Sequence, residues 1–126
     1  MRIIRGSEIQ YIPASHEDPN SPGVLKRVLA TRHDLIDGRI QMINWARLPA
    51  GSAFQAHYHE DMEEVFIILT GRVEAIVNGV VNELAAEDAI IIAPREVHSM
   101  RNLTDKDLEY VVLGISTEEG GQTVVV

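Results

Sequence analysis

The sequence predicts an all-β protein built as an antiparallel sandwich or barrel. Short apolar or alternating segments recur along most of the chain, and turn residues separate them at short intervals. No segment has the length and pattern of a convincing helix. Strands that alternate with helices would instead indicate parallel βαβ units, so this pattern favours antiparallel pairing.

The first third of the chain contains a loop and one long strand. Residues 13–23 are rich in Pro, Ser and Gly and are expected to form a loop. Residues 25–30 suit a helix by propensity and a strand by their apolar neighbours, so both remain open. Residues 39–48 alternate and predict a strand that places Met42 and Trp45 on opposite faces.

The remaining segments all predict strands. Residues 64–69 are nearly all β-formers, which is typical of a buried strand. Asn78-Gly79 stands between two apolar runs and predicts a tight hairpin, because both residues tolerate positive φ. Further strands are expected at residues 72–77, 80–84, 89–93, 97–102, 108–116 and 124–126.

Three histidines and a glutamate form a candidate metal site. His57 and His59 are two residues apart, so in a strand their imidazoles point to the same face. Glu64 follows closely, and His98 comes later in the chain. Three imidazoles and a carboxylate suit one divalent transition metal ion, which can be Fe, Mn, Ni, Cu, Co or Zn. His16 and His33 lie in polar stretches and are expected at the surface.

The same residues carry a family resemblance. Gly51, His57, His59, Glu64 and Gly71 match the first motif of the cupin superfamily at every defined position. The spacing to the second glycine selects this glutamate over its neighbour at position 63.

The second cupin motif is matched in part. His98 and Asn102 are kept, whereas Glu87, Ala93 and Arg95 stand where the family prefers Gly, Pro and Gly. These three departures concern the backbone of the turn before the histidine rather than the metal ligands.

The chain thus resembles a small single-domain cupin of the cupin 2 type, spanning residues 1–126 with its barrel core at about 40–115. The resemblance implies a jelly-roll β-barrel (double-stranded β-helix) with the metal inside. Strand alternation from the ligands then suggests residues that contact a substrate, although each also suits a core position. These are Gln55, Phe66, Ile68, Met100 and Asn102.

Four protein ligands leave about two positions open on an ion that favours six. The site would carry a charge of about +1 and favour a small organic anion. Cupins include dioxygenases, isomerases, decarboxylases and binding domains. The proposed pocket residues include no spare acid or base, which favours a dioxygenase-like oxidoreductase. The alternatives are an isomerase, epimerase or lyase that uses the metal as a Lewis acid, and a non-catalytic small-molecule-binding protein.

Composition limits the partners. The net charge of −8, with 19 acidic against 11 basic residues, disfavours nucleic acid and anionic membrane surfaces. No stretch is long and apolar enough to span a membrane, and charge near Met1 disfavours a signal peptide. The absence of cysteine excludes disulfides and fits a cytoplasmic protein. Apolar residues near both ends, at 3–4 and 124–126, predict exposed strand edges and a homodimer.

Overall fold

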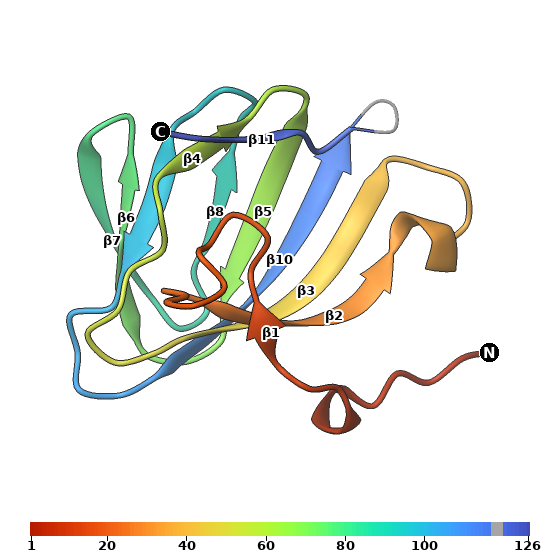
Figure 1. Cartoon of the computed structure of the whole chain (residues 1–126), viewed down its shortest axis with the longest axis horizontal. Coiled ribbons are helices and arrows are strands. Elements are labelled where there is room, and N and C mark those ends of the chain that lie inside the picture. Colours follow the sequence, from red (N-terminus) through yellow and green to blue (C-terminus); the bar gives the residue numbers. More distant parts are fainter. Residues whose placement is uncertain (117–119) are drawn as a thin grey trace.

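The computed structural model describes residues 1–116 and 120–126, and its strands form two antiparallel sheets (Figure 1). One sheet has six strands in the order β1-β2-β3-β10-β5-β8, and the other has five in the order β11-β4-β9-β6-β7. From β3 onward, most strands that follow one another in the sequence belong to different sheets, so the chain crosses repeatedly from one sheet to the other. The predicted all-β, jelly-roll architecture is therefore confirmed.

The segment at residues 25–30, which suits a helix or a strand, is a strand. One short 3-10 helix comes before this strand in the sequence and another follows it. No helix in the described part of the chain is long and apolar enough to cross a membrane. The elements are η1 (Gly6–Glu8), β1 (Ile12–Pro13), β2 (Leu25–Thr31), η2 (Arg32–Asp34), β3 (Ile40–Leu48), β4 (His57–His59), β5 (Met62–Ile68), β6 (Arg72–Val77), β7 (Val80–Ala85), β8 (Ala89–Ile92), β9 (His98–Arg101), β10 (Leu108–Ser116) and β11 (Thr123–Val125).

The predicted hairpin at Asn78-Gly79 is confirmed. Val77 pairs with Val80, so the two turn residues alone connect β6 to β7. Their φ angles of 47° and 82° are both positive, as a turn that matches the twist of the flanking strands requires.

The hydrophobic core lies between the two sheets. Burial alternates without a break along β10, and β5 follows the same alternation, so every second side chain of these neighbouring strands is buried. Met42 lines the inner side of β3, whereas the indole of Trp45 donates a hydrogen bond to Glu109 on the outer side. The predicted placement of these two residues on opposite faces is confirmed. Ile68 and Met100 belong to this core.

Two turns before His98, one on each side of β8, keep a glycine-like backbone without glycine. Glu87 and Arg95 occupy positions where cupins prefer glycine, and their φ angles are 81° and 68°. The left-handed region costs a non-glycine residue about 1–2 kcal/mol. The amide of Arg95 donates to the carbonyl of His59 at 2.7 Å, which ties the turn to β4. At Glu87 and Arg95 the departures from the second motif therefore add local backbone strain, and the turn at Arg95 is still tied to β4.

Asn102 fastens the loop between β9 and β10. Its amide nitrogen donates to the carbonyls of Leu48 at 3.0 Å and Lys106 at 2.7 Å. Its amide oxygen accepts hydrogen bonds from the backbone and hydroxyl of Thr104. The side chain is fully buried, and its hydrogen bonds hold this loop together and tie it to the end of β3.

Replacing Asn102 with alanine should lower the free energy of unfolding by about 2–4 kcal/mol, because buried backbone groups lose their partners. Urea denaturation of the two proteins measures the difference. Asn20→Ala, at an exposed loop position, is the matched control and should change stability by less than about 0.5 kcal/mol. Equal stability of the Asn102 variant and the parent protein would contradict the assigned role.

Candidate metal centre

An irregularity in strand pairing positions the first histidine. Phe54 donates its amide to the carbonyl of Met100, and His57 pairs with His98, so residues 55–56 stand opposite a single residue of β9. This is a β-bulge, and it shifts the alternation by one residue. Phe54 and His57 are consequently both buried although they are three residues apart.

The bulge also explains the position of Gln55. Unbroken alternation predicts this residue on the His57 face, but in the structure it is exposed and does not line the cavity. Its freed backbone groups have specific partners. The amide donates to Glu17 at 2.9 Å, and the carbonyl accepts a hydrogen bond from Nδ1 of His57 at 2.7 Å. The bulge therefore supplies the group that orients the imidazole.

Four buried side chains converge between the sheets. β4 contributes His57 and His59, β5 contributes Glu64, and β9 contributes His98. One candidate ligand atom from each lies within 4.8 Å of all the others. Glu64 is buried and Glu63, its neighbour, is only partly buried on the opposite face, in keeping with the choice made from the spacing. These four residues form a group that can hold a metal ion.

Outer hydrogen bonds orient the three imidazoles. Nδ1 of His98 donates to the carbonyl of Glu96 at 2.9 Å, just as His57 donates to its own backbone acceptor. Nδ1 of His59 lies 3.1 Å from the hydroxyl of Thr123 on β11. Such contacts to the outer nitrogen leave Nε2 of each ring available as a ligand.

The carboxylate of Glu64 stays charged despite its burial. Burial alone would raise its pKa, but hydrogen bonding with Nε2 of His59 at 2.9 Å and Nε2 of His98 at 3.0 Å lowers the pKa to about 2. Burial lowers the pKa of His57 to about 4, so this imidazole is neutral near pH 7. Neutral imidazoles and an ionised carboxylate are the forms that bind metals.

The donor set fits a divalent cation. His98 has an acceptor at both nitrogens, the carbonyl of Glu96 on one side and the carboxylate of Glu64 on the other. A neutral imidazole has only one N–H and cannot donate to both. A metal ion held by Nε2 of His98 and the carboxylate of Glu64 would remove this conflict, and nitrogen and oxygen donors suit the first-row transition metals.

A cavity of about 390 Å³ is lined by three of these four residues, His57, His59 and Glu64, and extends to β2 and β3. Phe66 lines it, whereas Ile68 and Met100 lie in the core and Asn102 is used by its loop. The structure therefore brings one of the five predicted substrate-contacting residues to the cavity wall. Apolar and polar residues absent from that prediction also line it: Val24, Lys26, Asn44, Phe54, Tyr110 and Val112.

His16 lies in this cavity, and the expectation of a surface position was wrong. Its ring stacks on that of His57 with centroids 4.0 Å apart, and its side chain is 16% exposed. Burial lowers its pKa to about 3, so the ring is neutral. Glu17 holds this segment in place by accepting hydrogen bonds from the backbone of Gly23 and Gln55. His33 is exposed, as expected, at the cavity mouth.

The path of the loop that carries His16 could not be read from the sequence. The loop between β1 and β2 lies in front of β5 and β10 (Figure 1), and composition predicts a loop without its path. The position of Asn44 could have been predicted from the sequence, because alternation along β3 places it on the same inward face as Met42 and Ala46. A polar residue among apolar ones on an inward face indicates a binding position.

Gly114 makes room for two methionines at the cavity. An added Cβ would lie 2.5 Å from Sδ of Met62 and 3.2 Å from Cε of Met42. Gly114 pairs with Glu64 on one side and Met42 on the other, so both thioethers lie in the region of the candidate ligand. Both methionines line the cavity.

Comparison with known proteins identifies the family. The family model described as Cupin domain matches residues 44–114, which is more than half of the chain. The chain belongs to the cupin family. Among curated protein sequences, none matches this chain.

Solved structures share the fold along nearly the whole chain. A predicted oxalate decarboxylase from Thermotoga maritima is 27% identical, with a TM-score of 0.78 over 91% of this chain and 99% of that chain. The polyketide cyclase RemF from Streptomyces resistomycificus is 17% identical, with a TM-score of 0.82 over 100% of this chain and 85% of that chain. A cupin-superfamily sugar phosphate isomerase from Silicibacter pomeroyi is 18% identical, with a TM-score of 0.74 over 92% and 76%.

Purified protein reconstituted with zinc, manganese or iron should hold about one ion per chain. His59→Ala and Glu64→Ala should each lower metal content at least about tenfold, because a missing ligand leaves the rigid site one donor short. Elemental analysis after gel filtration gives the stoichiometry. His33→Ala is the control and should hold as much metal as the parent. Full metal content in either ligand variant would remove this site.

Proposed function

We propose that this cupin is a metal-dependent enzyme that acts on a small organic anion. The observation that carries the proposal is the cluster of His57, His59, Glu64 and His98, three of which (His57, His59 and Glu64) line a cavity of about 390 Å³. A metal ion whose coordination positions are all filled by protein ligands has a structural role, whereas a metal site that faces a cavity leaves coordination positions for a ligand. The bound metal would supply a Lewis acid, and iron or manganese could also react with dioxygen.

The chain's own residues bind and orient the anion. Three neutral imidazoles and one carboxylate leave a divalent site with a charge of about +1, which attracts an anionic group in a partly apolar cavity. Phe54, Phe66 and Val112 form apolar walls that limit water. A lower local polarity strengthens every electrostatic contact to the ligand.

Lewis-acid chemistry, as in a lyase or isomerase, is the reaction class that the cavity supports best. The sequence favoured an oxygenase because the predicted pocket residues included no spare acid or base, but His16 lies in that pocket against His57. A neutral imidazole beside the reacting end of the ligand can hydrogen-bond an oxyanion as it develops. The similar structures described as a predicted decarboxylase and an isomerase support the same class.

Oxygen chemistry is the second candidate. Glu64 is the one carboxylate that lines the described part of the cavity, and it belongs to the candidate metal ligands. A cavity without a free carboxylate has few groups for acid–base catalysis, which favours a redox role for the metal. A protein that binds the anion without converting it would show the same ligand-induced stabilisation and no product.

A panel of 2-oxo and 2-hydroxy acids, tested with zinc and iron forms in air and under argon, separates these classes. A lyase or isomerase should convert its substrate with zinc, and removal of oxygen should not matter. Product formation measured by mass spectrometry decides the outcome. Turnover that requires both iron and oxygen would overturn the Lewis-acid proposal, because zinc has no accessible redox change.

His16→Phe is the matched variant for this assay. Phenylalanine keeps an aromatic ring against His57 and removes the ring nitrogens. We expect metal content to stay unchanged and kcat to fall about 10²-fold or more, in the range for loss of one oxyanion-stabilising donor. Unchanged kcat would show that His16 only packs in the cavity.

We also infer that two copies of the chain associate. Ile67 and Ile91 are 37% and 62% exposed on the outer face of the six-stranded sheet, and Ile3 and Ile4 are exposed near the N-terminus. Ile67 and Ile91 lie on the paired strands β5 and β8, and contiguous exposed apolar surface is a common mark of an interface. At the other end of the chain, β11 pairs with β4 within the same chain, so it contributes less than the sequence suggested.

Sedimentation velocity at micromolar concentration should give a dimer. Ile91→Lys should shift the population toward monomer, because a charge on the apolar face must be desolvated on association. Val80→Lys, at a solvent-facing position of the β6–β7 hairpin, is the control and should leave the dimer intact. A monomeric parent protein would refute the inference.

A further inference from the structure

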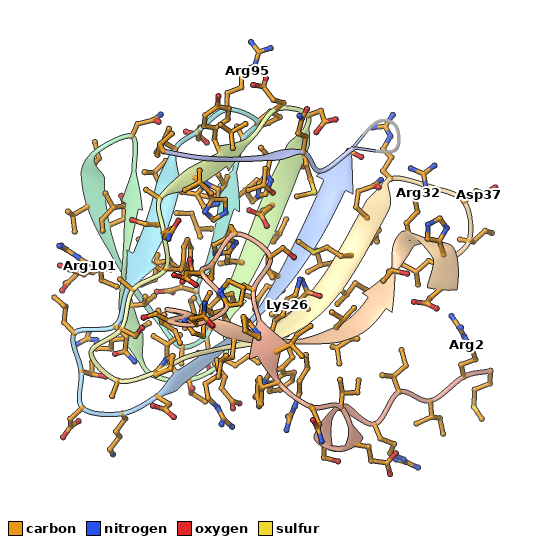
Figure 2. All side chains as sticks on the ribbon, in the orientation of Figure 1. Arg2, Lys26, Arg32, Asp37, Arg95 and Arg101 are labelled. Carbon is orange, nitrogen blue, oxygen red and sulfur yellow. The ribbon has the colours of Figure 1, made fainter. Side chains whose placement is uncertain are left out.

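The cavity has a cationic side chain at a distance from the candidate metal ligands. Lys26 on β2 lines the cavity, and its ammonium group donates a hydrogen bond to the hydroxyl of Ser15 at 2.8 Å. Ser15 immediately precedes His16, which stacks on His57. Figure 2 shows Lys26 in the middle of the view, over the sheet, whereas Arg95 and Arg101 project from the edges of the molecule.

We propose that Lys26 is the second anchoring point of the ligand, so that the cavity takes a small organic dianion. One anionic group would bind at the side of the candidate metal donors, and the second would bind the Lys26 ammonium. The inference rests on the proposed function and specifies its substrate class. It assigns a separate role to a residue on a different strand from all four candidate ligands.

Charge in the cavity supports two anionic groups rather than one. Among the described residues, no carboxylate lies within 4.0 Å of the charged group of Lys26 or of Arg32, which lines the rim at the end of β2. Glu64 is the one described carboxylate of the wall and is held by two histidines. This protein has a net charge of −8, so cavity cations without a carboxylate partner among the described residues are a local departure from its overall charge.

Burial makes the unpaired ammonium more receptive to an anion. Lys26 is partly buried, and burial lowers its pKa, which means that the charged form is poorly solvated there. An anionic group of the ligand would replace the missing solvent with a charge-assisted hydrogen bond. The Ser15 hydroxyl beside it can donate a further hydrogen bond to the same group.

Asn44 indicates that the ligand also carries a hydroxyl. The residue is 7% exposed and lines the cavity, and its side-chain oxygen has no hydrogen-bond partner among the described residues. Asn44 lies on β3, the strand next to β2, one inward position from Ala46, which pairs with Lys26. An unpartnered acceptor there calls for a donor on the ligand. A hydroxylated dianion supplies both the donor and the second charge.

Binding of three 2-hydroxy acids to the zinc-loaded protein tests the proposal. Lactate has one anionic group, 2-hydroxyglutarate has a second carboxylate, and 3-phosphoglycerate has a phosphate. Isothermal titration calorimetry should show at least one dianion binding about tenfold or more tightly than lactate, equivalent to about 1.4 kcal/mol. The comparison between the two dianions tells whether a carboxylate or a phosphate is preferred.

Lys26→Met should abolish the preference for the dianion and leave lactate affinity unchanged, because the methylene stem is kept and the charge removed. Lys26→Arg should retain most of the preference. Lys106→Met is the matched control, since Lys106 is the other lysine of the chain and is exposed. All variants are checked for parental melting temperature.

Equal affinity of the parent protein for lactate and both dianions would overturn the proposal, as would a dianion preference that survives in Lys26→Met. Zinc content is measured on the same samples. Missing zinc would refute the metal-dependent function on which the proposal rests. Equal affinities in protein that holds zinc would refute the role of Lys26 alone.

Discussion

The buried carboxylate of Glu64 is the constraint on which this structure depends. A carboxylate that is 5% exposed is costly unless positive charge or hydrogen-bond donors surround it. The fold brings imidazoles from β4 and β9 to it, and each of those strands lies in the opposite sheet from β5. The carboxylate therefore joins the two sheets across the interior. A neutral His98 cannot donate to both the Glu96 carbonyl and the Glu64 carboxylate, and a metal ion bound here would interact with the carboxylate instead.

The irregular segments are what allow these side chains to meet. The bulge before β4 turns both Phe54 and His57 inward, and its free backbone groups bind Glu17 and the His57 ring. Glu17 in turn fixes the loop that carries His16 and Ser15 over the cavity. One short interruption of strand pairing thus determines the orientation of a candidate ligand, the path of a loop and the shape of the cavity wall.

Much of the fold could be predicted because alternation and turn chemistry are local properties. The Asn78-Gly79 hairpin, the strand over β10 and the convergence of His57, His59, Glu64 and His98 all depend on spacings that strand geometry fixes. The cavity wall was harder to predict. Strict alternation of faces does not hold across a β-bulge, so the prediction placed Gln55 on the wrong face. Composition identifies a loop but not its path, so the cavity position of His16 could not be predicted. Asn102 matches the last position of the second cupin motif, but the spacing of the motif does not reveal the buried hydrogen bonds by which it holds the loop after β9.

Gly114 has a consequence for the long-term chemistry of the cavity. Because this residue has no side chain, the thioethers of Met42 and Met62 occupy the space beside the strand that carries Glu64. Thioethers are oxidised to sulfoxides, which are polar and larger. A reactive oxygen species released inside the cavity would meet these sulfur atoms before reaching solvent. Sulfoxide at Met42 and Met62, absent from the exposed Met1, would therefore act as a chemical record of oxidant produced within the protein rather than supplied from outside.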